Sequence, residues 1–208
     1  FCSVDLSALY LDVRKDRLYC ERPGSPERRA TQTALHGILD ALVRLMAPVL
    51  SFTAEDLWQH MPGSGRPESL FRAGLPEPPA AWCDEALAAT FERLLAVRAA
   101  VTKAIEEARQ GGLVKQAAEA EVGLGAGGVD GLATVLEARG AELPALFLTA
   151  GVTLDGGAGG TESPLVPGLR VRITRAGGQK CPRCWTVRVV GQDARHPELC
   201  ARCATVVA

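Results

Sequence analysis

The sequence predicts a mainly α-helical protein with a small α+β part and a separate terminal module that contains four cysteines. Three observations support this fold class. Apolar residues recur at helical spacing through most of the first 110 positions, strand-like runs follow a pair of glycines, and two Cys-x-x-Cys pairs lie in the last thirty residues. A chain of 208 residues can bury a core of ordinary size, so the cysteine module needs its own explanation.

The first part of the chain predicts a bundle of three antiparallel helices. An amphipathic helix is expected over 6–21 and a longer one over 26–47, where Pro48 ends it. Thr53 precedes "AEDLWQHM", whose acidic residues suit the start of a third helix. The Gly- and Pro-rich segment 62–81 is expected to be a surface connection.

The middle of the chain predicts a long helix that leads into a small α+β unit. Asp84 is expected to cap a helix that ends near Gln110, before two glycines. Beyond it, "EAEVGL", "ALFLTAGVTL" and "LRVRITRA" predict strands, and "GVDGLATVLEARG" predicts a short helix. The expected domains are a helical bundle at 1–80, which lacks its opening helices, the long helix with the α+β unit at 81–168, and the cysteine module at 169–208.

Four cysteines near the end of the chain have the spacing of a structural zinc site. Cys181 and Cys184 are separated by two residues, as are Cys200 and Cys203, with fifteen residues between the pairs. This spacing is typical of a zinc ribbon or knuckle, in which each pair occupies a tight turn and the four sulfurs form a tetrahedron. Two disulfides or a redox pair are the alternative. His196 could replace one sulfur, but four cysteines already complete the site.

Positive charge is concentrated in this module. The chain has a net charge of -1, but the segment 170–208 has two acidic residues against eight basic ones, namely Arg170, Arg172, Arg175, Lys180, Arg183, Arg188, Arg195 and Arg202. The other 169 residues therefore carry 15 basic and 22 acidic side chains. Such a patch indicates phosphate contact, although a solvated face would have the same composition. Trp185, next to a cysteine, could stack on a base or pack beneath the metal.

Catalytic and targeting motifs are missing from the sequence. There is no Gly-x-x-x-x-Gly-Lys loop, Gly-x-Ser-x-Gly elbow or His-Glu-x-x-His motif, so a binding module is expected. The scattered Cys2, Cys20 and Cys83 suit free buried thiols in a reducing compartment such as the cytoplasm, and no apolar stretch is long enough for a membrane span. Because residue 1 is Phe and a helical pattern follows at once, we expect a piece of a longer protein.

Several segments together resemble the C-terminal region of bacterial isoleucyl-tRNA synthetase. They are "DLSALYLDVRKDRLYC", "RRATQTALHGILDALVRLMAPVLSFTAEDLWQHMP", "ITRAGGQKCPRCW" and "LCARC". The resemblance covers nearly the whole chain and implies an anticodon-binding helical domain followed by a zinc module. Where the family usually has "IGKSLEAEV", this chain has "VKQAAEAEV", so Lys115, Ala117 and Ala118 depart from the family pattern at this turn.

The resemblance implies a monomeric cytoplasmic class I ligase that uses ATP and Mg²⁺ to join isoleucine to its tRNA. The "HIGH" and "KMSKS" motifs of the family's ATP site do not occur here, so catalysis and editing are expected upstream. This chain would bind the anticodon stem-loop, with one structural Zn²⁺. The expected RNA contacts are Lys15, Arg28, Arg29, Lys180, Arg183, Trp185, Arg188 and Arg202.

Two other functions remain open at this point. A DNA-repair glycosylase of the formamidopyrimidine type has a similar terminal zinc finger, although the synthetase-like helices at 6–62 argue against it. A purely structural zinc module, whose arginines only increase solubility, would have no RNA affinity above that of any basic surface.

Overall fold

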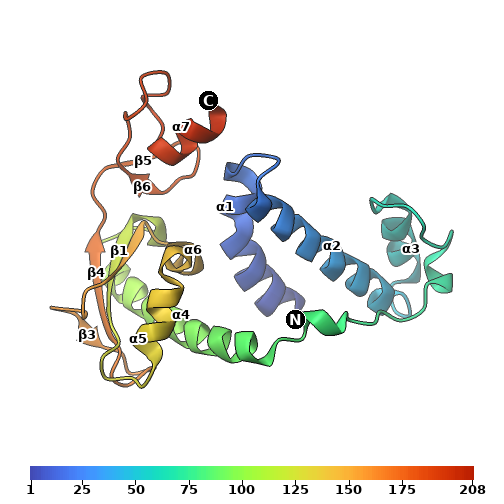
Figure 1. Cartoon of the computed structure of the whole chain (residues 1–208), viewed down its shortest axis with the longest axis horizontal. Coiled ribbons are helices and arrows are strands. Elements are labelled where there is room, and N and C mark those ends of the chain that lie inside the picture. Colours follow the sequence, from blue (N-terminus) through green and yellow to red (C-terminus); the bar gives the residue numbers. More distant parts are fainter. The chain divides into compact units, whose positions relative to one another are not determined.

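The computed structural model describes all residues from Phe1 to Ala208 (Figure 1). The chain forms two compact units, and unit 1 is made of two separate stretches, Phe1–Arg22 and Glu85–Ala208. Unit 2 is the continuous segment Pro23–Asp84. The domain ranges expected from the sequence, 1–80, 81–168 and 169–208, follow different borders and stay a prediction.

Unit 2 is built on two helices, α2 (Pro26–Met46) and α3 (Ser51–His60). Ser25 caps α2, because its Oγ accepts a hydrogen bond from the backbone N–H of Arg28 at 3.2 Å. The sequence predicts that α3 begins after Thr53, but the helix starts at Ser51, two residues before Thr53, without a side-chain cap.

The core of unit 2 surrounds Trp58, which is 2% exposed. Its indole N–H donates to the carbonyl oxygen of Pro67 at 3.0 Å, and the guanidinium groups of Arg44 and Arg66 lie 5.5 and 5.1 Å from its ring. The connection expected at 62–81 thus packs on α3 at one end. It contains only the short turns η2 (Leu70–Arg72) and η3 (Ala80–Trp82).

Unit 1 begins with a helical stretch and continues after unit 2 with the long helix. The stretch comprises η1 (Cys2–Leu11), which is π-helical, and α1 (Asp12–Cys20), and the long helix is α4 (Glu85–Gln110). Helix α4 ends at two glycines, the second of which has φ 74. Val13 of α1 is buried in the same apolar cluster as Val97 and Val101 of α4.

A four-stranded mixed sheet completes the core of unit 1, in the order β2-β1-β4-β3. The strands are β1 (Ala120–Gly125), β2 (Gly151–Leu154), β3 (Thr161–Glu162) and β4 (Arg170–Arg175). β1 pairs in parallel with β2 and antiparallel with β4. Helices α5 (Leu132–Ala138) and α6 (Leu143–Phe147) connect β1 to β2, and α6 also contacts α1.

Only four of the ten residues in the run "ALFLTAGVTL" form strand, which corrects the expectation. Leu143, Leu146 and Phe147 are buried at helical spacing on α6, and Pro144 occupies the first turn, where a missing N–H costs nothing. Leu148 then adopts a left-handed backbone with φ 61 and ends the helix. Only the last four residues of the run, Gly151–Leu154, form a strand.

The cysteine module consists of a small hairpin and a helix. The hairpin pairs β5 (Gln179–Lys180) with β6 (Val187–Arg188), and the helix is α7 (Ala201–Val207), which the sequence did not predict. The predicted fold class, mainly α with a small α+β part and a four-cysteine module, is confirmed. None of the helices combines the length and apolarity needed to span a membrane.

Candidate metal centre and nucleic-acid interface

The structure brings together the four cysteines that the sequence predicted as metal ligands. The Sγ atoms of Cys181, Cys184, Cys200 and Cys203 all lie within 4.8 Å of one another. Around a tetrahedral Zn²⁺ with bonds of about 2.3 Å, sulfurs stand roughly 3.8 Å apart. The Cys184 and Cys200 sulfurs are 4.0 Å apart, far more than the roughly 2.05 Å of a disulfide. The donor set therefore fits one zinc ion.

Each cysteine pair lies on a hydrogen-bonded local element, a turn for the first pair and the start of a helix for the second. The turn of the first pair is closed by hydrogen bonds from Trp185 N to Cys181 O at 2.9 Å and from Cys181 N to Thr186 O at 3.1 Å. The second pair occupies the start of α7, where the Ala204 N–H donates to Cys200 O. An antiparallel bridge between Val190 and Cys200 brings the two structures together.

The thiols differ in acidity before any metal binds. Burial raises the pKa of Cys181, but backbone N–H groups, including those of Cys184 and Cys200, outweigh it and lower the pKa to about 6. Burial raises the pKa of Cys203 to about 12 and also raises that of Cys200. The cluster can thus carry a thiolate on its own, whereas a divalent ion is needed to ionise all four groups.

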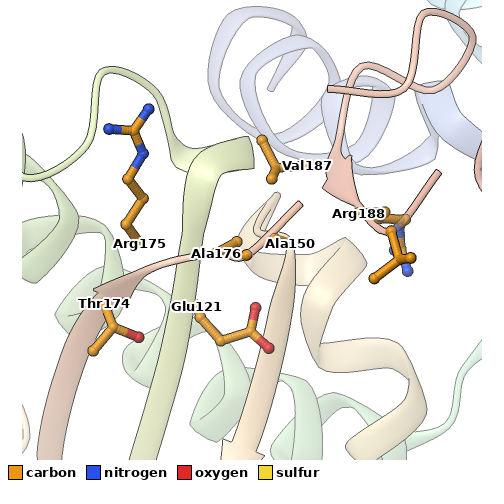
Figure 2. A pocket seen from close by; sticks show the side chains of 9 residues that line it. Glu121, Ala150, Thr174, Arg175, Ala176, Val187 and Arg188 are labelled. Atoms are coloured by element: carbon orange, nitrogen blue, oxygen red, sulfur yellow. The ribbon is translucent and has the colours of Figure 1, made fainter. Parts of the chain in front are cut away.

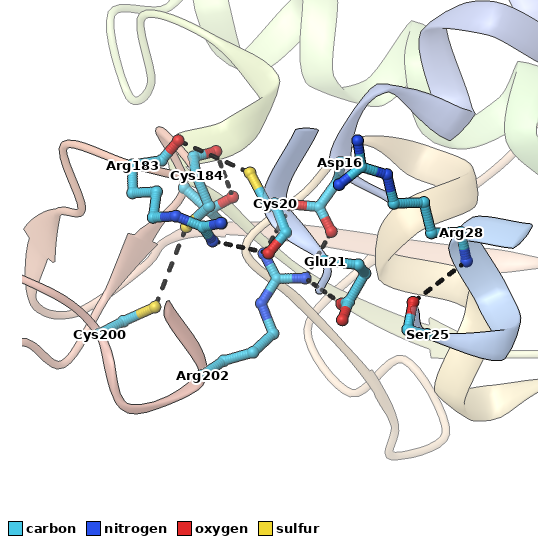
Figure 3. A network of polar contacts seen from close by, with 10 residues as sticks. Asp16, Cys20, Glu21, Ser25, Arg28, Arg183, Cys184, Cys200 and Arg202 are labelled. Carbon is cyan, nitrogen blue, oxygen red and sulfur yellow. Dashed lines mark hydrogen bonds and ion pairs between the residues drawn. The ribbon is translucent and has the colours of Figure 1, made fainter. Parts of the chain in front are cut away.

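Two arginines of the module bond the end of helix α1, as Figure 3 shows. Arg202 donates through both Nη atoms to the Asp16 carboxylate, with Nη2 2.6 Å from Oδ1, and its Nη1 lies 3.4 Å from Oε1 of Glu21. Arg183 Nη1 donates to the carbonyl oxygen of Cys20 at 2.6 Å. In return, the Cys20 thiol donates to the Arg183 carbonyl oxygen at 3.6 Å.

These contacts change the acidity of the groups involved. Burial raises the pKa of Asp16, but the hydrogen bond and the charge of Arg202, together with smaller contributions from Cys20 and Arg188, outweigh it, so the net shift is downward. The same bond raises the pKa of Arg202. Burial, followed by the negative charge of Asp16, raises the pKa of Cys20 to about 11 and keeps this thiol protonated at neutral pH.

Trp185 presents its ring to solvent, and the alternative that it packs beneath the metal is wrong. It is 67% exposed and lies outside the module's apolar cluster, whose buried members besides cysteines are Leu199 and Ala204. Its indole N–H donates to Pro182 O at 3.1 Å, and the exposed Lys180 places its Nζ 5.6 Å from the ring centroid. Ring and cation thus form one surface.

The remaining basic candidates lie in different parts of the chain. Lys15 is exposed on α1 and binds Asp12 at 2.6 Å, and Arg188 is half-buried on β6. Arg28 and Arg29 lie in the first turns of α2, in unit 2. The module therefore brings together Lys180 and Trp185, whereas Arg188 pairs with Gln179 across the hairpin and lines the pocket described next. The contact of any of these residues with RNA stays a prediction.

A pocket of about 360 Å³ lies between the sheet and the module's hairpin (Figure 2). Its lining includes Glu121 of β1, Thr174 and Arg175 of β4, and Val187 and Arg188 of β6. Sequence reasoning missed this pocket, because Glu121 and Arg188 are 67 positions apart and no motif links them.

The unusual segment at 115–118 forms an ordered turn. The backbone N–H of Lys115 donates to the Glu119 carboxylate at 3.0 Å, and a short helical turn, η4 (Ala117–Glu119), leads into β1. Ala117 packs against the core of unit 1. The departures at Lys115, Ala117 and Ala118 are thus compatible with a regular entry into the sheet.

Comparisons with known proteins agree with this anatomy. Residues 1–124 match the family model described as the anticodon-binding domain of tRNA ligase, and residues 178–206 match the zinc finger found in FPG and IleRS. Isoleucine-tRNA ligases are similar over the whole chain: that of Desulforudis audaxviator is 47% identical over 212 residues, and those of Symbiobacterium thermophilum and Moorella thermoacetica are each 44% identical over 214. The chain spans 23% of the length of these relatives.

Proposed function

Since this chain belongs to the family of anticodon-binding domains of tRNA ligases, we propose that it binds the anticodon stem-loop of isoleucine tRNA as part of an isoleucine-tRNA ligase. One observation carries the proposal. An anticodon-binding family match and a four-cysteine zinc finger occur in the same chain, which is similar from end to end to proteins named isoleucine-tRNA ligase.

The whole protein would be a monomeric cytoplasmic enzyme that joins isoleucine to its tRNA at the expense of ATP. ATP and Mg²⁺ would act at a catalytic domain outside these 208 residues, since no ATP-site motif of the family occurs in them. The contribution of this chain is binding and orientation of the RNA, which raises the rate of a distant reaction by holding the substrate in place.

In this proposal Cys181, Cys184, Cys200 and Cys203 hold one structural zinc ion. When bound, the ion cross-links the hairpin to α7 in a module that has little apolar core of its own. Its role is to keep the surface around Trp185 rigid.

The proposed RNA surface of the module consists of Trp185 and Lys180, and Arg188 of the same hairpin is proposed as a further phosphate contact. An exposed ring can stack on an unpaired anticodon base, and the neighbouring cation can bind the adjoining phosphate. Lys15 on α1 and the pair Arg28 and Arg29 on α2 are proposed as further backbone contacts, which position the RNA without reading its sequence. Arg183 and Arg202 were also predicted to bind RNA, but both guanidinium groups already bond helix α1.

The test is binding of the chain to stem-loops of isoleucine and valine tRNA at near-physiological salt. We expect tighter binding of the isoleucine hairpin, and a Trp185→Ala variant should bind it about 5- to 150-fold more weakly, because loss of one stacked base costs about 1–3 kcal/mol. Trp82→Ala is the control, since Trp82 is 60% exposed in unit 2. Equal and weak binding of both hairpins by the unmodified chain would refute specific recognition.

The glycosylase alternative has less support. The zinc-finger description includes FPG, but only residues 178–206 match it, whereas isoleucine-tRNA ligases match the whole chain. Preference for a duplex DNA with an oxidised purine over the isoleucine hairpin would favour that alternative. No specific binding to either nucleic acid would favour a purely structural module.

A further inference from the structure

We propose that Arg202 and Arg183 are positioning residues that lock the metal module onto the C-terminal end of helix α1, so that metal binding fixes where the exposed Trp185 surface stands in unit 1. The role of this surface in RNA binding rests on the function proposed above. The lock itself is a property of unit 1 and can be tested without RNA.

The first part of the lock is a charged pair between α7 and α1. Arg202 donates through both Nη atoms to the two oxygens of Asp16, and Glu21 lies on the same guanidinium at 3.4 Å. A two-point guanidinium–carboxylate pair fixes direction as well as distance. Both side chains of the Asp16–Arg202 pair are only about a third exposed, 38% and 34% respectively, so solvent screens the pair less than it would at an open surface.

The second part of the lock is a cap on helix α1. Helix α1 ends at Cys20, whose carbonyl oxygen accepts the 2.6 Å bond from Arg183. The last carbonyls of a helix lack partners within it and attract positive charge, so a guanidinium at this point satisfies an acceptor and complements the helix dipole. Arg22 strengthens the same contact by donating to the carbonyl oxygen of Thr205 in α7.

Both locking arginines occupy the same position in their cysteine pairs. The first pair reads Cys-Pro-Arg-Cys and the second reads Cys-Ala-Arg-Cys, so each arginine lies directly before the second cysteine. A metal held by all four sulfurs fixes the backbone on either side of Arg183 and of Arg202. Loss of the metal would free both guanidinium groups at once, which couples metal binding to docking on α1.

Helix α1, on which the module docks, is itself packed into the core of unit 1. Val13 is 8% exposed within the main core of unit 1, and α1 contacts helix α6 of the α+β unit. The module's apolar cluster, by contrast, contains no residue of α1 or of the sheet. Polar contacts therefore carry the attachment of the module to α1, and single substitutions can release it.

The experiment compares Arg202→Gln, Asp16→Asn and the double variant in the full 208-residue chain. Arg195→Gln is the matched control, because it removes the same charge from the same module but pairs only with Asp193 in its own loop. Bound zinc is counted by mass spectrometry, and hydrogen exchange is followed at the amides of residues 18–21. We expect every variant to keep one zinc. Both single variants should speed amide exchange at the end of α1, and the double variant should exchange little faster than either single one. The control should change neither the zinc count nor the exchange rate.

Removal of zinc from the unmodified chain with a strong chelator should speed exchange at the same amides. Unchanged exchange at 18–21 after zinc removal, or in both single variants, would overturn the lock. Equal acceleration by Arg195→Gln would overturn it as well, because that result would mean a general charge effect.

Hairpin binding separates the lock from direct RNA contact. If Arg202 touched RNA directly, Asp16→Asn would leave affinity unchanged or raise it, since it removes a negative charge near the phosphates. The lock predicts weaker binding in both Arg202→Gln and Asp16→Asn, on the order of fivefold or more. If the unmodified chain binds no hairpin, the proposed function fails while the exchange data still decide the lock.

Discussion

Replacement of Cys203 by serine should unfold the cysteine module and leave the rest of unit 1 folded. The module's apolar cluster has only Leu199 and Ala204 buried besides cysteines, with Val190 partly buried. Burial of these side chains contributes about 3–5 kcal/mol. A structural zinc contributes on the order of 10 kcal/mol of apparent folding free energy, so the metal stabilises the module more than its apolar side chains do. A serine hydroxyl at Cys203 would be a poor replacement for the thiolate.

The assay is a ¹H–¹⁵N NMR spectrum of the chain under reducing conditions, together with a zinc count. In the Cys203→Ser variant, the amide signals of 178–206 should collapse to the narrow range of unfolded peptide, and the zinc count should fall from one toward zero. The signals of β1 and β4 should keep their dispersion, because the main core of unit 1 contains no residue of the segment 178–206.

Cys83→Ser is the matched control, since Cys83 is an exposed thiol in unit 2 and should affect neither readout. Dispersed module signals in zinc-free Cys203→Ser protein would refute the reasoning, because they would mean that the small apolar cluster suffices to fold the module.

Three further predictions concern other parts of the chain. Trp58→Phe should lower the free energy of unfolding of unit 2 by about 1–3 kcal/mol, measured by urea titration, because it shrinks the buried ring and leaves the carbonyl of Pro67 without its indole donor. Gly125→Ala should disrupt the sheet, because its Cβ would lie 2.0 Å from a backbone oxygen, whereas Gly127→Ala meets nothing within 4 Å and should leave the melting temperature unchanged. The pKa of Asp16 lies below its ordinary value of 3.8, so its pairing stabilises the folded chain fully above that pH and is lost as the pH falls through the lower folded value. The Arg202 Nε–H signal should therefore shift only when the pH falls below 3.8.

The helices and the metal centre were largely predictable from the sequence. The long helices at 26–46 and 85–110 have apolar residues on one face over several turns. A segment with such extended periodicity forms a helix in most tertiary environments. The cysteine spacing likewise predicted a cluster of four sulfurs, because metal ligation is a local requirement of each pair. Short elements were harder to predict from the sequence. The apolar run that contains α6 is compatible with helix or strand, and α7 is only seven residues long.

The engagement of the module's arginines could not be predicted. The local excess of positive charge made Arg183 and Arg202 candidates for phosphate contact. The sequence shows this charge density but not the partner of each side chain. Their partners, Cys20 and Asp16, lie more than 160 positions earlier. Which guanidinium is already bonded depends on the three-dimensional placement of α1, and no local pattern encodes it.

The contact between Asp16 and Arg202 also has a consequence for synthesis on the ribosome. The two residues are 186 positions apart, so at about 5–20 residues per second Asp16 is synthesised roughly 10 to 40 s before Arg202. Unit 2 is continuous and can fold within that interval, whereas unit 1 consists of two stretches that flank it. Docking of the module on α1 therefore joins a newly made segment to a helix that was translated before unit 2.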